Sequence, residues 1–149
     1  MHLGLKTRLL VFADSAFKKE ESTGHALKGA VWLRVPFGPL IGTSKCHVID
    51  FVAKRVRHVT RSTFSAELFS LCDAADTAII IASVSHEQIH GSTYATTARS
   101  LREQGGYDME IELITDAMSV FAATTANHVQ MPAEKYLLSR IQFLHELCD

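Results

Sequence analysis

The sequence has 149 residues, with 15 Lys/Arg against 16 Asp/Glu and 47% hydrophobic residues. These values fit one globular domain with a single core and exclude a disordered chain. No apolar run approaches the roughly 20 residues that a bilayer requires, so we expect no membrane span. The start, MHLGLKTRLL, lacks the apolar region of a signal peptide, and the three cysteines form no CxxC pair, so we expect an unsecreted protein in a reducing compartment.

Three strands are expected in the first third of the chain. Residues 7–14 (TRLLVFAD) form an apolar run flanked by charge, and residues 26–35 (ALKGAVWLRV) are rich in β-formers. A third strand is expected over residues 46–53, after a loop that contains two prolines and two glycines. Because the connections are short, the sequence predicts an antiparallel meander, with Trp32 in its core.

The pattern then becomes helical. Ser62 or Thr63 can cap a helix whose apolar residues recur at helical spacing, and the stretch TAIIIASVS predicts burial of its second half. The later expected elements are a short helix near 97–104, a strand at 109–115, a helix from Ala117 to about Asn127, and a helix from Pro132 to about Leu147. Without the short helix the order is βββαβαα, an α/β (α+β) single domain.

Three carboxylates lie next to segments that are expected to be apolar and buried, where acidic residues are uncommon. Asp14 ends the first apolar strand, Glu67 lies on or beside the apolar stripe of the long helix, and Asp116 ends the fourth strand. Each has an ordinary structural explanation: a turn with Ser15, a position just off the stripe, and a helix N-cap. Isolated ionised carboxylates near a core are costly, however, so the three together could converge on one divalent-cation site.

The segment HVIDFVAKRVRHVTRSTFSAELFSLCDAAD resembles the ribonuclease H segment of copia-type LTR retrotransposon polyproteins. The earlier VFADSAF resembles the first strand of that family, the later LITDAMSVFA its fourth strand and following helix, and PAEKYLLSRIQFLHEL the helix after it. The matching features around Glu67 are Phe51, Ala53-Lys54-Arg55, Arg61-Ser62-Thr63 and Ala66-Glu67. The resemblance implies a ribonuclease H-like mixed sheet.

The resemblance also implies a two-metal ribonuclease that cuts the RNA strand of RNA–DNA hybrids. Asp14 would bridge two Mg²⁺ (or Mn²⁺) ions about 4 Å apart, while Glu67 and Asp116 hold them in position. The partners would be the hybrid and a reverse transcriptase domain of the same polyprotein. The location would be a retroelement particle in the cytoplasm or nucleus.

Charge is unevenly distributed along the chain. Residues 1–61 hold eleven Lys/Arg and four Asp/Glu, a net +7, whereas residues 62–149 hold four and twelve, a net -8. The basic half could neutralise phosphates, although a solvated loop is the simpler interpretation of its densest stretch. The expected phosphate contacts are Lys54, Arg55 and Arg57. The hydroxyls expected near substrate 2′-OH groups are those of Ser15, Ser62 and Thr63.

The family pattern continues past residue 149 into a final strand and a helix that carries a fourth aspartate. Residues 1–149 are therefore expected to form a single ribonuclease H-like domain that is incomplete at its C-terminus, and Asp149 is a poor substitute for the fourth acid. One alternative is consequently a catalytically inactive, retroelement-derived domain that still binds nucleic acid.

A second alternative is a zinc hydrolase. His86-Glu87-Gln88-Ile89-His90 matches HExxH, in which two histidines one helical turn apart bind zinc and the glutamate acts as general base. Gly91 follows at once, however, and a third ligand is required. The sequence offers only guesses for it: His128, Glu103 or Glu110.

Overall fold

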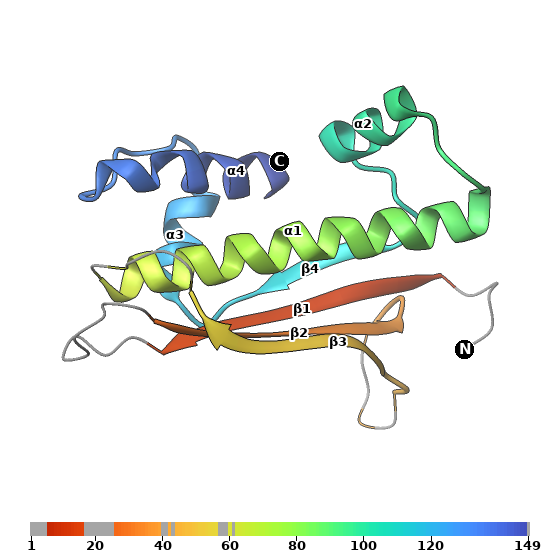
Figure 1. The fold of residues 1–149 in the computed structure, drawn as a ribbon, viewed down its shortest axis with the longest axis horizontal. Helices are drawn as coiled ribbons and strands as arrows, with labels where there is room; N and C mark the ends of the chain where they lie inside the picture. Colours follow the sequence, from red (N-terminus) through yellow and green to blue (C-terminus); the bar gives the residue numbers. More distant parts are fainter. Residues whose placement is uncertain are drawn as a thin grey trace.

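The computed structural model describes residues 6–16, 26–39, 42, 44–56, 60 and 62–148. Figure 1 shows four strands below a long helix, with the remaining helices beyond it. In chain order the elements are β1 (Thr7–Ala16), β2 (Leu27–Pro36), β3 (His47–Arg55), α1 (Thr63–His90), α2 (Ala95–Gln104), β4 (Glu110–Ile114), α3 (Met118–Thr125), the 3₁₀ turn η1 (Lys135–Leu137) and α4 (Leu138–Cys148).

The four strands form one mixed sheet in the order β3-β2-β1-β4. β1 pairs antiparallel with β2, and β2 with β3, as the short connections predict. β4 pairs parallel with β1, and the chain reaches it from β3 at the opposite edge of the sheet through α1 and α2. The mixed α/β class expected from the sequence is therefore confirmed.

Helix α1 begins and ends where its sequence predicts. Ser62 is the N-cap, and its hydroxyl accepts from the Ser65 N–H at 3.1 Å. The Ser65 hydroxyl in turn accepts from the Ser62 backbone N–H at 3.2 Å, which completes a capping box. Gly91 ends the helix at φ 81°, a conformation that favours glycine. Candidate metal-binding residues lie near both ends of α1: Glu67 near its start, and His86 and His90 near its end.

The core lies between α1 and the sheet. Leu68, Ala75, Ala78 and Ala82 of α1 are at most 1% exposed. Trp32 is core, as expected, and its Nε1 donates to the Ala74 carbonyl at 3.1 Å. An 18-residue window of α1 has a mean hydropathy of 1.5, enough by length and composition for a membrane span, but half of that window is buried inside the protein. Packing on the sheet accounts for the buried half of that window. The expected burial of the helix's second half is wrong, however: after Ala75 only Ala78 and Ala82 are buried, and Ile80 and Val84 are 64% and 50% exposed because they face away from the sheet.

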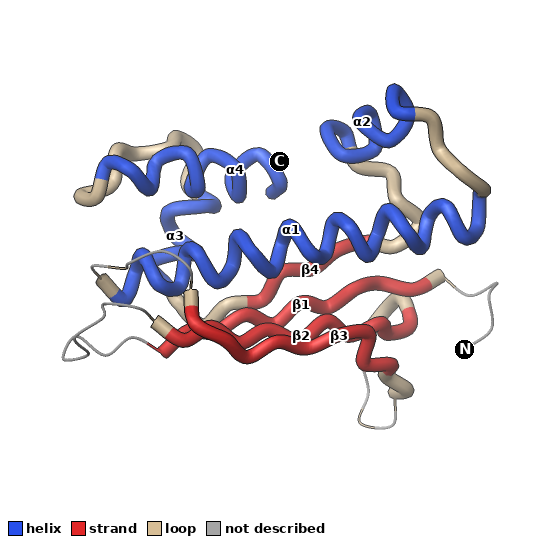
Figure 2. The backbone as a smooth tube through the Cα atoms, viewed as in Figure 1, coloured by secondary structure: helices blue, strands red, loops and turns tan. Residues whose placement is uncertain are grey.

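The described helices all lie on one side of the sheet (Figure 2). On the opposite side a row of apolar side chains crosses three strands: Phe12 pairs with Val31, and Val31 with Phe51. Phe12 is 43% and Phe51 74% exposed, so the described elements leave this face open to solvent.

The C-terminal region departs from expectation. Pro132 does not open a helix: residues 126–134 are irregular, and α4 begins only at Leu138 after the η1 turn. Glu134 takes an extended backbone, and its carboxylate accepts from the hydroxyls of Ser62 and Tyr136, both at 2.5 Å. Ser62 and Glu134 are 72 positions apart in the sequence. Their hydrogen bond holds Glu134 outside the helix that Pro132 predicts, and the local sequence does not reveal it. The other boundaries fall within a few residues of expectation, and α2 is the short helix expected near 97–104.

Candidate metal centre

Two of the three candidate carboxylates lie side by side because of the sheet register. Phe12 of β1 pairs with Ile114 of β4, and the two strands run parallel. Asp14 and Asp116 each lie two residues further on, so they meet at the same end of the sheet. Both are exposed there. In Figure 1 this is the end of the sheet where α1 begins.

The third carboxylate comes from α1. Glu67 is in the second turn of the helix and is only 8% exposed, which confirms the expectation that it lies on or beside the buried stripe. One turn later, the Ser70 hydroxyl donates to the backbone carbonyl of Asp14 at 2.9 Å. That bond ties this part of α1 to the end of β1, and it was not anticipated from the sequence.

The three side chains form one cluster. One carboxylate oxygen from each of Asp14, Glu67 and Asp116 lies within 4.8 Å of the others. Helix capping does not explain Asp116, because Ala117 is the N-cap of α3 and the helix has no side-chain cap. The turn contact expected of Asp14 is present: Ser15 N–H donates to its Oδ1 at 2.7 Å, which engages one of its two carboxylate oxygens.

The cluster raises the pKa of Glu67 above its ordinary value. Desolvation by burial is the largest cause, and the negative charges of Asp14 and Asp116 raise the pKa further. The hydroxyl and backbone N–H of Ser15 act in the opposite direction and partly offset the rise. The charged groups acting on Glu67 are thus other carboxylates, and a bound cation would relieve their mutual repulsion.

The donor set fits magnesium. Mg²⁺ prefers carboxylate and water oxygens at 2.0–2.1 Å, so two oxygens on one ion lie up to about 4 Å apart. The three oxygens lie within 4.8 Å of one another, a limit close to that span, and the exposed sides of Asp14 and Asp116 leave room for water ligands. Asp149, the poor substitute for a fourth acid, lies outside the described residues.

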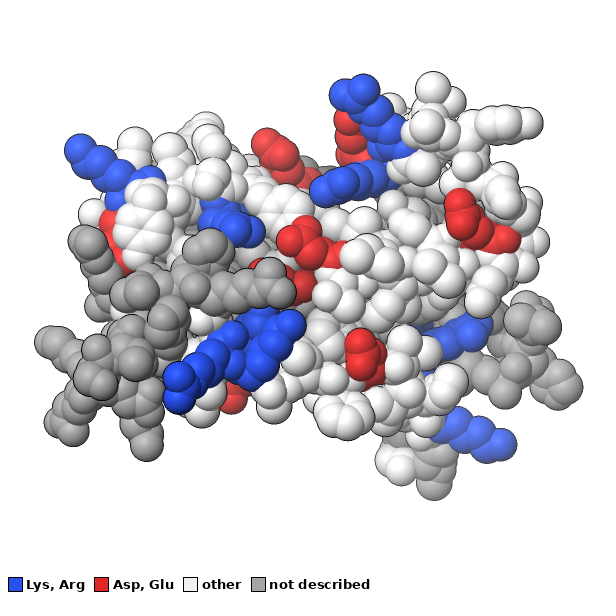
Figure 3. All heavy atoms as spheres, viewed as in Figure 1, with Lys and Arg blue, Asp and Glu red and all other residues white. Residues whose placement is uncertain are grey.

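The expected phosphate contacts lie at the end of β3. Lys54 and Arg55 are both exposed, and Figure 3 shows Lys and Arg side chains gathered over this part of the sheet. Lys54 pairs across the sheet with Lys28, which pairs in turn with Ser15, the neighbour of Asp14. Adjacent strands are about 4.8 Å apart, so the Lys54 backbone lies about 10 Å from that of Ser15. Arg57 lies outside the described residues.

Lys28 has a different role from the exposed lysines. It is 8% exposed and forms an ion pair with Asp73 of α1. Asp73 is therefore paired with the sheet, whereas Asp76 of the same helix is exposed.

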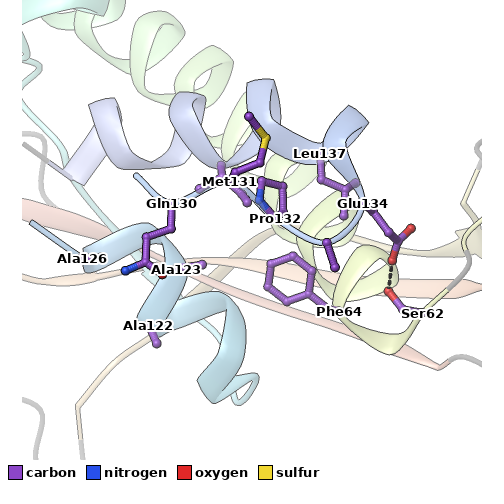
Figure 4. A pocket seen from close by; sticks show the side chains of 12 residues that line it. Ser62, Phe64, Ala122, Ala123, Ala126, Gln130, Met131, Pro132, Glu134 and Leu137 are labelled. Atoms are coloured by element: carbon purple, nitrogen blue, oxygen red, sulfur yellow. Dashed lines mark hydrogen bonds between the residues drawn. The ribbon is translucent and has the colours of Figure 1, made fainter. Parts of the chain in front are cut away.

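The hydroxyls expected near the substrate occupy three different environments. Ser15 lies beside Glu67, and Thr63 is exposed at the start of α1. Ser62 instead donates to Glu134 at the rim of an apolar cavity of about 600 Å³, seen in Figure 4. Phe64, Ala123, Met131 and Leu137 also line this cavity. None of the three clustered carboxylates is among its lining residues, and the Ser62 hydroxyl is engaged by Glu134.

The HExxH histidines do come together, at the opposite end of α1 from the carboxylates. Their third neighbour is Asp108, which the sequence did not single out, and not His128, Glu103 or Glu110. Glu87, the general base of an HExxH enzyme, instead accepts from the Thr93 hydroxyl at 2.8 Å and from the Thr93 N–H at 3.2 Å. These bonds lower its pKa, and they hold the carboxylate on the turn after α1.

No family model and no curated protein matches the sequence. Among solved structures, the prototype foamy virus protease-reverse transcriptase matches at 11% identity and a TM-score of 0.35, over 97% of this chain and 21% of that one. The PFV RNase H domain matches at 10% identity and a TM-score of 0.34, over 94% of this chain and 92% of that one. Both TM-scores are below 0.5, and these likenesses carry no conclusion about the role of this chain. The strands themselves form a mixed α/β fold, with the sheet order β3-β2-β1-β4 and β4 parallel to β1.

Proposed function

We propose that this chain is a metal-dependent ribonuclease H domain of a copia-type retroelement polyprotein, which hydrolyses the RNA strand of RNA–DNA hybrids. The observation that carries the proposal is the convergence of Asp14, Glu67 and Asp116 from three different elements. Two of the ordinary structural explanations are weakened: Asp116 caps no helix, and Glu67 is buried. A binding site for divalent cations accounts for all three positions at once.

Each carboxylate has a distinct part in holding the cations. Asp14 would hold the ions from β1, which lies between β2 and β4, while Asp116 and Glu67 would hold them from the end of β4 and from α1. Bound Mg²⁺ would supply activation of a water molecule and stabilisation of the leaving 3′-oxygen. The buried flank of Glu67 excludes solvent from one side of the centre, and the Ser70–Asp14 bond fixes that flank to β1.

The substrate would approach along the end of the sheet. Lys54 and Arg55 are exposed, and with Arg57 they supply positive charge for the phosphates, which steers any nucleic acid towards this end. Selection of a hybrid over duplex DNA would then depend on contacts to the RNA 2′-OH groups. Ser15 and Thr63 are better placed for that role than Ser62, whose hydroxyl is bonded to Glu134.

The proposal includes the setting of the domain. Its sequence resemblance supports a reverse transcriptase domain in the same polyprotein and a retroelement particle in the cytoplasm or nucleus. It also implies a fourth aspartate beyond residue 149, which would complete the metal centre.

The test is cleavage of an end-labelled RNA–DNA hybrid in Mg²⁺, with duplex DNA of the same sequence as the substrate control. This chain is compared with one extended by the downstream strand and helix of its polyprotein. We expect cleavage confined to the RNA strand, at least by the extended chain, and its loss on Asp14→Asn or Glu67→Gln. Inactivity of both chains with hybrid binding intact would instead support the nucleic-acid-binding alternative, and activity that survives either substitution would refute the metal assignment.

A further inference from the structure

A second cluster of metal-binding side chains lies at the other end of α1. His86 and His90 are one turn apart near the end of the helix, and Asp108 lies in the bend before β4. Nineteen residues separate Glu67 from His86, which is about 29 Å along an α-helix. The two clusters are therefore separate sites.

The three side chains point at one another. Asp108 Oδ2 is 2.6 Å from His90 Nε2 and 3.5 Å from His86 Nδ1, and one ligand atom of each residue lies within 4.8 Å of the others. The two imidazole rings are 4.5 Å apart between centroids. A convergence of two nitrogens and one carboxylate oxygen is a donor set that suits zinc.

The cluster leaves polar atoms unsatisfied. His86 Nδ1 is buried and has no hydrogen-bond partner among the described residues, and the buried Asp108 Oδ2 is contacted only through its ion pairs with the two histidines. Buried polar atoms without partners are costly, and most have an explanation such as an ion. The His86 and Tyr107 rings make a T-shaped contact, with centroids 6.1 Å apart, so Tyr107 contacts the His86 ring of the cluster.

We propose that His86, His90 and Asp108 bind a divalent transition-metal ion, for which Zn²⁺ is the best fit. Ligand atoms around tetrahedral zinc are about 3.3 Å apart, since each bond is about 2.0–2.1 Å. The His86–Asp108 separation of 3.5 Å matches that value, whereas the His90–Asp108 separation must widen. The His90 side chain is 51% exposed and so has room to move, and water would fill the fourth position.

The site would be structural and not hydrolytic. Glu87, the would-be general base, accepts hydrogen bonds from the hydroxyl and the N–H of Thr93 and is not one of the clustered ligands. The ion would instead join the end of α1 to the start of β4 and close the segment 91–107, which includes α2. All of α2 is described and none of its residues is buried, so the helix has no core of its own to hold it (Figure 1). A metal ion bound by His86, His90 and Asp108 would hold both ends of the segment 91–107 in place.

The test is Zn²⁺ titration of the full chain against a chromophoric chelator, in excess Mg²⁺ to occupy the carboxylate centre. We expect one bound Zn²⁺, with affinity reduced by a factor on the order of ten or more in His90→Ala and in Asp108→Asn. His128→Ala is the matched control, since His128 is an exposed histidine outside the cluster, and its affinity should equal that of the unmodified chain. Asp14→Asn should also retain zinc, so the result stands or falls independently of the ribonuclease proposal.

A second readout separates binding from loss of fold. His90 is half exposed, so His90→Ala should keep the circular dichroism of the unmodified chain while losing the rise in melting temperature that Zn²⁺ produces. The proposal is overturned if the unmodified chain binds no zinc, in which case the cluster is an ion pair only. It is equally overturned if His90→Ala and Asp108→Asn bind zinc as tightly as the unmodified chain does.

Discussion

Replacing Glu67 with glutamine should stabilise the metal-free protein at neutral pH. Glu67 lies within 4.8 Å of two other carboxylates, and its pKa is raised by burial and by their charges. At 4.8 Å two unit charges repel by about 0.9 kcal/mol in water and by about 3.5 kcal/mol at an effective dielectric constant of 20. Because Asp14 and Asp116 are exposed, the lower value applies to each, and we expect Glu67→Gln to gain about 1–2 kcal/mol.

The pH dependence of this gain follows from the direction of the pKa shift. A carboxyl whose pKa is higher in the folded state destabilises the fold once it is ionised, so its cost is present at neutral pH. The cost disappears as the pH falls below the unfolded value of about 4.3. Glu67→Gln and the unmodified chain should therefore differ in free energy of unfolding at pH 7 in EDTA, and the electrostatic part of that difference should vanish below pH 4.

Urea unfolding at the two pH values measures both quantities. Asp76→Asn is the control, because Asp76 is an exposed acid on the same helix and its substitution should change stability by less than about 0.5 kcal/mol. Added Mg²⁺ should stabilise the unmodified chain more than Glu67→Gln and so reduce or reverse the gap. Equal stability of the two chains at pH 7, or a gain that persists unchanged at acid pH, would refute the repulsion argument.

Three further outcomes test other parts of the structure. Leu68→Ala empties a fully buried position between α1 and the sheet and should cost about 2–5 kcal/mol in urea unfolding; a cost below 1 would contradict the core assignment. Lys54→Ala and Arg55→Ala should each weaken hybrid binding and lower the slope of log affinity against log salt by about 1, whereas unchanged slopes would remove β3 from the interface. Burial raises the pKa of Cys72 to about 12, so at pH 8 iodoacetamide should modify the exposed Cys46 and spare Cys72 until the protein unfolds.

The sheet and α1 were predictable because their signals are local. Apolar runs at residues 7–14 and 26–35 identify buried strands, short connections impose antiparallel pairing, and a serine cap with helical spacing marks the start of α1. The proximity of Asp14 and Asp116 follows from an acid just beyond the paired residues of each strand, because β4 lies parallel to β1.

The errors and omissions come from contacts between distant residues. Pro132 predicts a helix start, but Ser62 and Tyr136 hold Glu134 in an extended conformation and delay α4. Asp108 has no local signal as a partner of His86 and His90, because their proximity depends on how the chain returns to the sheet after α2. Sequence periodicity therefore located the elements, and it could not specify contacts made where the chain turns back.

The central claim is that Asp14, Glu67 and Asp116 form one centre for divalent cations. Its most direct test is a Mn²⁺ titration followed by electron paramagnetic resonance. The signal measures free Mn²⁺, and the difference from the total Mn²⁺ gives the number of ions that the protein binds. We predict that Asp14→Asn loses Mn²⁺ that the unmodified chain binds, that Mg²⁺ competes for those ions, and that His90→Ala retains them. Equal Mn²⁺ binding by Asp14→Asn and the unmodified chain would contradict the claim.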